Sequence, residues 1–186
     1  MKFAIITDSF PPLKNSGAIQ VRDLSLEFVR QGHEIVVITP SSEISTRYLL
    51  EEVDRVQVVR LKAPKIRDIS YLCRGIGEFF MPFMMIRKLK RNSLIENKLD
   101  GIITYAPSIF LGPLANMLKK KNNCKNYLIL RDIFPQWAVD VGLLSNYGLP
   151  YYFLKRVERY LYSTADIIGV QTPANLKYFN ENVASR

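Results

Sequence analysis

Short apolar stretches alternate with amphipathic ones along the chain. The first, KFAIIT at residues 2–7, is rich in β-branched residues and predicts a buried strand. From Ala18 to Gln31 the apolar positions recur with helical spacing, so that residues such as Val21 and Phe28 share one face. The stretch EIVVIT at residues 34–39 predicts the next strand. A strand, a helix and a second strand in this order favour a parallel pair in one sheet.

The same alternation continues to the end of the chain. Further strands are predicted at VQVVRL, GIIT, NYLIL and DIIGVQT, which are residues 56–61, 101–104, 126–130 and 166–172. Helices are predicted at residues 71–99, with Pro82 inside, and at 108–121, 151–162 and 173–182. Residues 40–55 are polar and unpatterned. We therefore expect one domain over residues 1–186, a Rossmann-like three-layer α/β/α sandwich with a mostly parallel sheet.

Composition adds a surplus of positive charge. The 186 residues include 26 Lys or Arg and 17 Asp or Glu, which gives a net charge of +9. This surplus favours an anionic partner such as a nucleotide, a phosphorylated lipid or a membrane surface, although a basic surface kept for solubility is the plain alternative. Nucleic acid is not expected, because basic residues interleaved with aromatics and a recognisable binding module are both lacking.

Cysteine usage and the N-terminus bear on location. Cys73 and Cys124 are far apart and form no CxxC pair, which disfavours a disulfide framework or a zinc site. We expect neither a metal nor a cofactor. The apolar start MKFAIITDSF is too short for a signal peptide, and an acidic residue follows too soon. No apolar run reaches the roughly 18 residues that a membrane-spanning helix needs. The expectation is a cytoplasmic protein.

Residues 75–92, GIGEFFMPFMMIRKLKRN, are apolar on most sides and then strongly basic. At helical spacing one stripe contains Phe79, Phe83, Ile86 and Leu89, and Phe80 and Met84 widen it. Such a helix can bury aromatic rings among acyl chains while its cations meet anionic headgroups. The predicted membrane contacts are Phe79, Phe80, Phe83, Arg87, Lys88, Lys90 and Arg91. A core helix with a solvated end fits the same pattern, and both interpretations stay open.

Irregular segments follow several of the predicted strands. They are DSFPPLKNSG, TYAPS and RDIFPQW. In parallel sheets ligands bind at the carboxyl ends of the strands, so we expect these segments to gather at one edge. Gly17 lies at a helix N-terminus, where free N–H groups and the helix dipole favour phosphate. Asn15 or Ser16 can equally be a plain N-cap.

The segment RDIFPQW places two opposite charges and an indole at a strand end. Asp132 can act as a base or accept a hydroxyl hydrogen bond, and Arg131 can hold a phosphate or pair with a carboxylate. Trp137 can stack on a sugar or a base. The alternative is a structural pair of Arg131 and Asp132 with the indole in the core. Neither GxGxxG nor GxxxxGK[ST] occurs, so a nicotinamide cofactor and a P-loop are not supported.

Five segments together resemble the retaining glycosyltransferases of family four, which have the two-domain GT-B architecture. They are FPPLKNSGA, RQGHEIVVIT, TYAPSIFLGPLA, LILRDIFPQWAVDVGLL and RVERYLYSTADIIGVQTPANLKYF, and they run in family order across almost the whole chain. The similarity is closest to members that build bacterial surface polysaccharides, including those that move N-acetylfucosamine-like sugars. The resemblance implies an N-terminal, acceptor-side domain that lacks the C-terminal donor-binding domain and is inactive alone.

The family's activity implies the partners. They are a nucleotide-sugar donor and a saccharide acceptor, often a polyprenyl-diphosphate-saccharide, in the synthesis of capsule, O-antigen or exopolysaccharide. Such an acceptor implies peripheral association with the inner face of the cytoplasmic membrane. Retaining transfer in this fold is described as front-face attack, in which the protein mainly positions groups and stabilises charge.

The resemblance also assigns roles to residues. Gly17 matches the glycine whose backbone approaches the donor phosphates, although Ala18 replaces the second glycine of many members. Asp132 stands where the family faces the reacting sugar and where other branches often carry a histidine, and it is the implied catalytic residue. The implied substrate or donor contacts are Asn15, Ser16, Gly17, Tyr105, Pro107, Arg131 and Trp137. A non-catalytic α/β module that binds anionic lipid or a partner protein remains the alternative.

Overall fold

The structure, a computed structural model, describes residues 1–92, 94–95 and 98–182. Its strands form one seven-stranded sheet in the order β3-β4-β2-β1-β5-β6-β7. The strands are β1 Lys2–Thr7, β2 Glu34–Ser41, β3 Tyr48–Val53, β4 Val56–Lys62, β5 Gly101–Ala106, β6 Lys125–Leu130 and β7 Ile167–Val170. β3 pairs with β4 in antiparallel fashion, and the other neighbouring pairs are parallel. The expected mostly parallel α/β sheet is confirmed.

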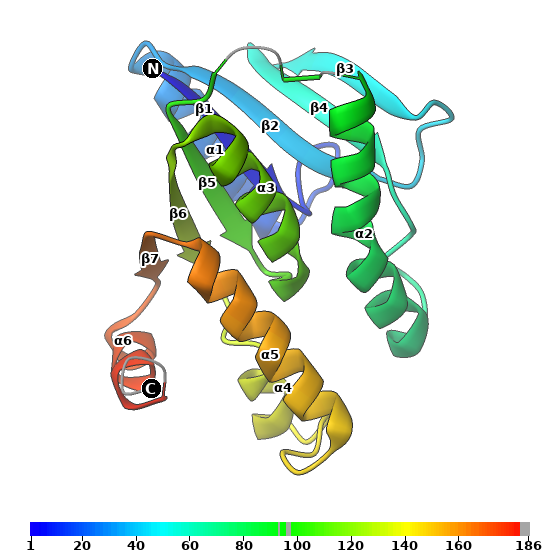
Figure 1. The fold of residues 1–186 in the computed structure, drawn as a ribbon, viewed down its shortest axis with the longest axis vertical. Coiled ribbons are helices and arrows are strands. Elements are labelled where there is room, and N and C mark those ends of the chain that lie inside the picture. Colours follow the sequence, from blue (N-terminus) through cyan, green and yellow to red (C-terminus); the bar gives the residue numbers. More distant parts are fainter. Residues whose placement is uncertain (93, 96–97, 183–186) are drawn as a thin grey trace.

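Helices cover both faces of the sheet (Figure 1). They are α1 Ser16–Arg30, α2 Tyr71–Asn92, the 3-10 turn η1 Ile109–Leu111, α3 Gly112–Asn122, α4 Gln136–Asp140, α5 Leu149–Thr164 and α6 Pro173–Asn182. Successive strand side chains point to opposite faces. Accordingly, Ala4 and Ile6 pack in the cluster with residues of α2 and α3, whereas Ile5 packs in the cluster with Val21 of α1.

Strand β3 is missing from the sequence-based prediction, which treats residues 40–55 as irregular. Its side chains are mostly half-buried or exposed, because it is the edge strand, and so it lacks the apolar run of the inner strands. Asp54 and Arg55 close a two-residue hairpin turn with φ of 52° and 65°. A turn with left-handed conformation at both central positions normally signals itself by Asn-Gly or Asp-Gly. Asp54-Arg55 is not such a pair, so the sequence did not predict the turn.

The helix predicted for residues 71–99 is shorter in the structure. It continues through the buried Pro82 but ends at Asn92. Residues 94–95 and 98–99 are not helical, so the predicted extent is wrong there, and residues 93 and 96–97 lie outside the described residues. The short helix α4 is also missing from the prediction, since five residues are too few to show a helical period.

Candidate functional site at the carboxyl edge of the sheet

Segments that are distant in sequence meet where the strand order changes direction. The chain moves from β1 outward to β2 on one side and later returns to place β5 on the other side. This is the position where open α/β sheets bind ligands. Arg131, directly after β6, donates from Nη1 to Ser16 Oγ at 3.1 Å and to the Tyr105 hydroxyl at 3.3 Å. The structure therefore brings the first helix, β5 and the end of β6 together, as the strand-end rule predicts.

The N-terminus of α1 carries backbone N–H groups with no acceptor inside the helix. Asn15 is the N-cap, and its Oδ1 accepts from Ala18 N at 2.8 Å and from Ser9 Oγ at 2.8 Å. The first backbone bond of the helix joins Ile19 N to Asn15 O at 3.2 Å. The backbone N–H groups of Ser16 and Gly17 therefore have no hydrogen-bond acceptor within the helix. Together with the helix dipole and Arg131 they form a positive edge suited to an anion.

Gly17 leaves space beside Arg131. A methyl group at this position would lie 3.5 Å from Asn15 Oδ1 and from Tyr105 Cε1, and 3.7 Å from Arg131 Nη1. These are ordinary van der Waals distances, so packing of the protein alone does not require a glycine here. Gly17 is buried, and the missing side chain lets Asn15, Tyr105 and Arg131 lie close to its backbone.

Tyr105 holds Arg131 in place. Its hydroxyl donates to Gln20 Oε1 at 2.6 Å and accepts from Arg131 Nη1. Burial raises the pKa of Tyr105, while the hydrogen bond from Arg131 lowers it by less than burial raises it. The phenol therefore remains neutral at physiological pH and links α1 to the guanidinium. The strand extends through Tyr105 and Ala106, so the loop expected at TYAPS begins at Pro107.

The alternative of a structural pair between Arg131 and Asp132 is wrong. Arg131 donates to Ser16 and Tyr105, and no ion pair joins it to Asp132 in the described chain. Asp132 is exposed. Trp137 lies in α4, is 45% exposed and packs its ring 5.9 Å from that of Phe134, so it is not a core residue. The described hydrogen bonds do not connect Asp132, Trp137 or the half-buried Pro107 to the cluster around Arg131.

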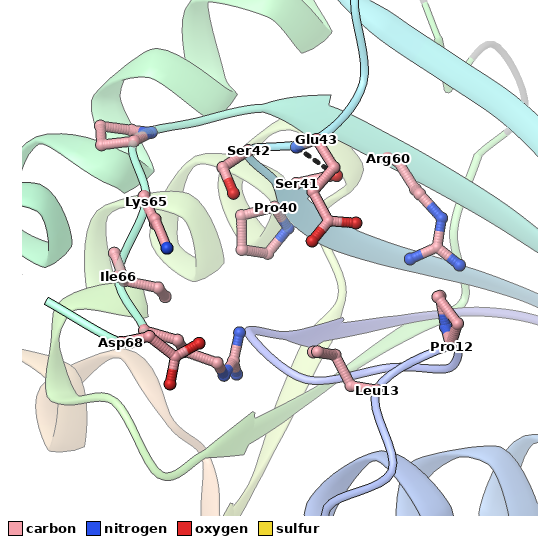
Figure 2. Close-up of a pocket in the computed structure, with 12 residues that line it drawn as sticks. Pro12, Leu13, Pro40, Ser41, Ser42, Glu43, Arg60, Lys65, Ile66 and Asp68 are labelled. Carbon is pink, nitrogen blue, oxygen red and sulfur yellow. Dashed lines mark hydrogen bonds between the residues drawn. The ribbon is translucent and has the colours of Figure 1, made fainter.

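A hollow of about 120 Å³ lies where the first loop meets the ends of β2 and β4 (Figure 2). Pro12 and Leu13 of the first loop form part of its wall. Its polar lining includes Ser41, Ser42, Glu43, Lys65, Arg67 and Asp68. The sequence-based prediction missed these residues. The strand-end rule that selected the other segments applies equally to PSSEI after β2 and PKIRD after β4, and would have found them.

Asp8, the first residue after β1, is a further group that the sequence-based prediction missed. It is 4% exposed, and its Oδ1 has no hydrogen-bond partner among the described residues. Arg67 Nη2, from the wall of the hollow, donates to Asp8 O at 2.8 Å and lies 3.8 Å from Oδ1. Burial raises the pKa of Asp8 to about 6, with Arg67 opposing and Glu78 adding to the rise. The sequence offered one signal for Asp8, which is that an acidic residue directly follows an apolar strand.

The apolar stripe predicted for residues 75–92 is only partly correct. Leu89 is buried in the core together with Met81 and Met85, and Phe79 and Ile86 are half-buried. The exposed apolar face of α2 instead consists of Leu72, Ile76, Phe80, Phe83 and Met84. The cations Arg87, Lys90 and Arg91 are exposed, whereas Lys88 is half-buried. Burial lowers the pKa of Lys88, and Arg87 and Arg47 add to the effect.

In residues 1–92, 94–95 and 98–182 no helix combines the length and the apolar character needed to cross a bilayer.

Comparisons with known proteins point to glycosyltransferases. No protein-family model matches the chain. The chain is 26% identical over 119 residues to the probable glycosyltransferase WbjE of Pseudomonas aeruginosa, a match that covers 62% of this chain and 29% of WbjE.

Solved structures show the same fold. The UDP-forming α,α-trehalose-phosphate synthase from Burkholderia xenovorans, in complex with glucose-6-phosphate, matches with a TM-score of 0.59 and 16% identity, over 100% of this chain and 43% of that one. UGT89C1 of Arabidopsis thaliana with UDP-L-rhamnose matches with a TM-score of 0.55 and 16% identity, over 100% of this chain and 45% of that one. The chain thus has the α/β fold of GT-B glycosyltransferase domains, and it spans less than half the length of these relatives.

Proposed function

We propose that the chain is the N-terminal, acceptor-side domain of a glycosyltransferase that moves a sugar from a nucleotide-sugar to a saccharide acceptor. The similarity to WbjE and the GT-B fold support the reaction class. The observation that carries the proposal is the contact of Arg131 with Ser16 and Tyr105 beside the helix N-terminus at Gly17. A second domain that holds the nucleotide is part of the proposal, and the chain alone is then expected not to turn over.

The positive edge suits the charge that develops during sugar transfer. As the bond from the sugar to the nucleoside diphosphate breaks, negative charge grows on the departing phosphate. Preorganised N–H groups at Ser16 and Gly17 and the guanidinium of Arg131 stabilise such charge without reorganising. Asp132, exposed at the end of β6, is assigned to accept a hydrogen bond from a hydroxyl of the reacting sugar or acceptor.

The hollow beside the first loop is assigned to the acceptor saccharide. Ser41 and Ser42 offer hydroxyls, Glu43 and Asp68 offer carboxylates, and Lys65 offers an ammonium group. This mixture of hydrogen-bond donors and acceptors, with charges of both signs, suits the hydroxyls of a neutral sugar. Figure 2 shows Glu43, Lys65 and Asp68 around one space.

The finer assignment rests on the five segments that resemble family four. It comprises a retaining mechanism, a sugar of the N-acetylfucosamine type, a polyprenyl-diphosphate-linked acceptor, and a pathway to capsule, O-antigen or exopolysaccharide. It places the protein in the cytoplasm at the inner face of the membrane. The exposed Phe80, Phe83, Arg87, Lys90 and Arg91 of α2 support that last point.

The alternative function is a non-catalytic module that binds anionic lipid or a partner protein. The exposed apolar face of α2 favours it as well. The two functions differ in what they require at Gly17 and Arg131, because only sugar transfer uses the positive edge.

The deciding experiment is a titration of the chain with a panel of nucleoside diphosphates and nucleotide-sugars, followed by the backbone amide resonances. We expect at least one compound to shift the amides of Ser16 and Gly17, and Arg131→Ala to remove the effect. Arg22→Ala is the matched control, because Arg22 is on the same helix but pairs with Asp23. If no compound shifts these amides at millimolar concentration, the assignment of the positive edge is wrong.

A further inference from the structure

An apolar groove runs between two helices that the sugar-transfer site does not use. α2 and α5 flank η1 and α3 on one face of the sheet (Figure 1). The groove has a volume of about 350 Å³. α2 contributes Phe79 and Phe83, η1 contributes Phe110, and α5 contributes Arg156, Val157 and Tyr160.

Close packing beneath the groove fixes its shape. α3 begins at Gly112, where a methyl group would lie 3.0 Å from the Tyr160 ring and 3.2 Å from Leu161 Cα, so the missing side chain lets α3 approach α5. α2 contacts the other helices through Phe79, whose ring centre lies 6.3 Å from that of Phe110 and 5.9 Å from that of Phe153. The groove is therefore bounded by aromatic rings that pack against one another.

The rim of the groove exposes large apolar side chains. Phe80 is 53% exposed, Phe83 49% and Phe153 48%. Exposed aromatic residues that adjoin one another mark an interaction surface rather than a solvated face. On α5, Leu149 and Tyr152 extend the same exposed apolar surface.

The charges around the groove have one sign. Arg156 lines it directly and is exposed. On α2, Arg87 and Lys90 follow Phe83 by four and seven positions, which places them on the same helical face. Among the described lining residues none carries a carboxylate, and the neighbouring Glu78 and Glu158 are buried. An occupant with an apolar body and a negative end would complement both properties.

We propose that this groove takes one acyl chain of an anionic phospholipid from a membrane leaflet, with Arg156, Arg87 and Lys90 at the headgroup phosphates. An acyl chain has no hydrogen-bonding groups to satisfy, which suits a lining of ring and aliphatic atoms. Interfacial helices place their aromatic rings in the acyl region and their cations at the level of the headgroups, which is the arrangement proposed here. The inference rests on the proposed membrane association, extends it from α2 to α5, and is independent of sugar transfer.

Fluorescence quenching by brominated lipid tests the groove. Trp137 is the single tryptophan, so a Trp137→Phe background is dark. In that background Phe83→Trp places a fluorescent reporter in the groove. Leu50→Trp is the matched control, because Leu50 is 56% exposed but lies on β3, away from the groove. With phosphatidylglycerol vesicles brominated in the chains, at low salt, we expect the groove reporter to lose most of its emission and the control to lose little. Failure to bind these vesicles, or binding with equal quenching of both reporters, would overturn the proposal.

Charge variants and a solution measurement separate other occupants. Arg156→Glu should weaken binding to phosphatidylglycerol vesicles severalfold, whereas Lys177→Glu on α6 should not, and phosphatidylcholine vesicles should bind neither form. Equal binding by all variants would overturn the headgroup contact. If the chain dimerises in solution and Phe83→Asp restores the monomer, a second copy is the occupant and the lipid proposal fails. None of these results depends on the nucleotide-sugar titration.

Discussion

Arg131 Nη1 lies 3.1 Å from Ser16 Oγ, although the two residues are 115 positions apart in the chain. The contact crosses β5, which separates β1 from β6 in the sheet, and the Tyr105 hydroxyl of β5 joins it midway. A helix N-terminus, a buried phenol and a guanidinium are thereby held as one unit. The relationship explains why an arginine follows β6 although no carboxylate of the described residues pairs with it.

Arg131→Lys should weaken binding of the nucleotide-sugar or nucleoside diphosphate about tenfold or more, since a charge-assisted hydrogen bond is worth roughly 1.5–3 kcal/mol. Lysine keeps the charge but loses the planar guanidinium, in which Nη1 donates to the Ser16 and Tyr105 oxygens while a second N–H group can meet a phosphate. Isothermal titration with the compound found in the amide titration measures the effect. Arg22→Lys serves as the control and should leave affinity unchanged. Equal affinity for both variants would remove Arg131 from the site.

Gly17→Ala should separate folding from binding. The added methyl group meets its neighbours at 3.5–3.7 Å, so the fold accepts it. Alanine is favoured over glycine in a helix by up to about 1 kcal/mol, so the free energy of unfolding should stay equal or rise. Binding of a phosphate-bearing ligand should weaken, because the methyl group occupies the space beside Arg131. Urea denaturation and titration of the same sample check both results; unchanged affinity would contradict the role of Gly17.

The sequence predicted the inner sheet well for a physical reason. A parallel strand buried on both faces is a nearly continuous apolar run, and KFAIIT at residues 2–7 matches β1 at both ends. The gathering of Ser16, Tyr105 and Arg131 followed from topology, because the ends of parallel strands share one edge. The edge strand β3 was not predicted, because its residues are half-buried or exposed and so lack the apolar run of the inner strands.

Other features depend on burial that a pattern cannot show. α2 is apolar on most sides, so periodicity alone could not decide whether Leu89 or Phe80 faces the sheet, and packing selects Leu89. The raised pKa of Asp8 comes from its burial, to which Glu78 adds and which Arg67 opposes, and both of these residues lie on later segments. The groove between α2 and α5 requires a third helix between them, and no local pattern carries that information.

Asp8→Asn should raise stability at neutral pH and lose that advantage in acid. The pKa of Asp8 rises from 3.8 to about 6 on folding, against Arg67 and Arg74 and with Glu78. The protonated Asp8 carboxyl therefore contributes its full share of the unfolding free energy below pH 3.8. This share, about 3 kcal/mol, is lost as the pH rises through 6 and the carboxyl ionises. The difference in unfolding free energy between variant and parent should shrink by roughly half between about pH 7.5 and about pH 5.

Urea denaturation at several pH values measures this difference. Asp23→Asn is the control, because the Asp23 carboxylate is exposed on α1, where it pairs with Arg22. The control should follow the parent at every pH. A pH-independent difference for Asp8→Asn would mean that Asp8 does not change its protonation on folding.

The buried ion pair of α5 should dominate the stability of the groove's wall. Glu158 is 1% exposed, lies 2.5 Å from Lys155 Nζ and accepts from the Tyr162 hydroxyl at 3.0 Å. Glu158→Ala removes the carboxylate from the half-buried Lys155, which keeps its hydrogen bond to the Tyr178 hydroxyl, and leaves the buried Tyr162 hydroxyl without its acceptor, so it should cost about 3 kcal/mol. Tyr162→Phe keeps the ion pair and should cost about 1 kcal/mol. Chemical denaturation checks the order, because equal costs would mean that Glu158 stabilises α5 through the hydroxyl and not through Lys155.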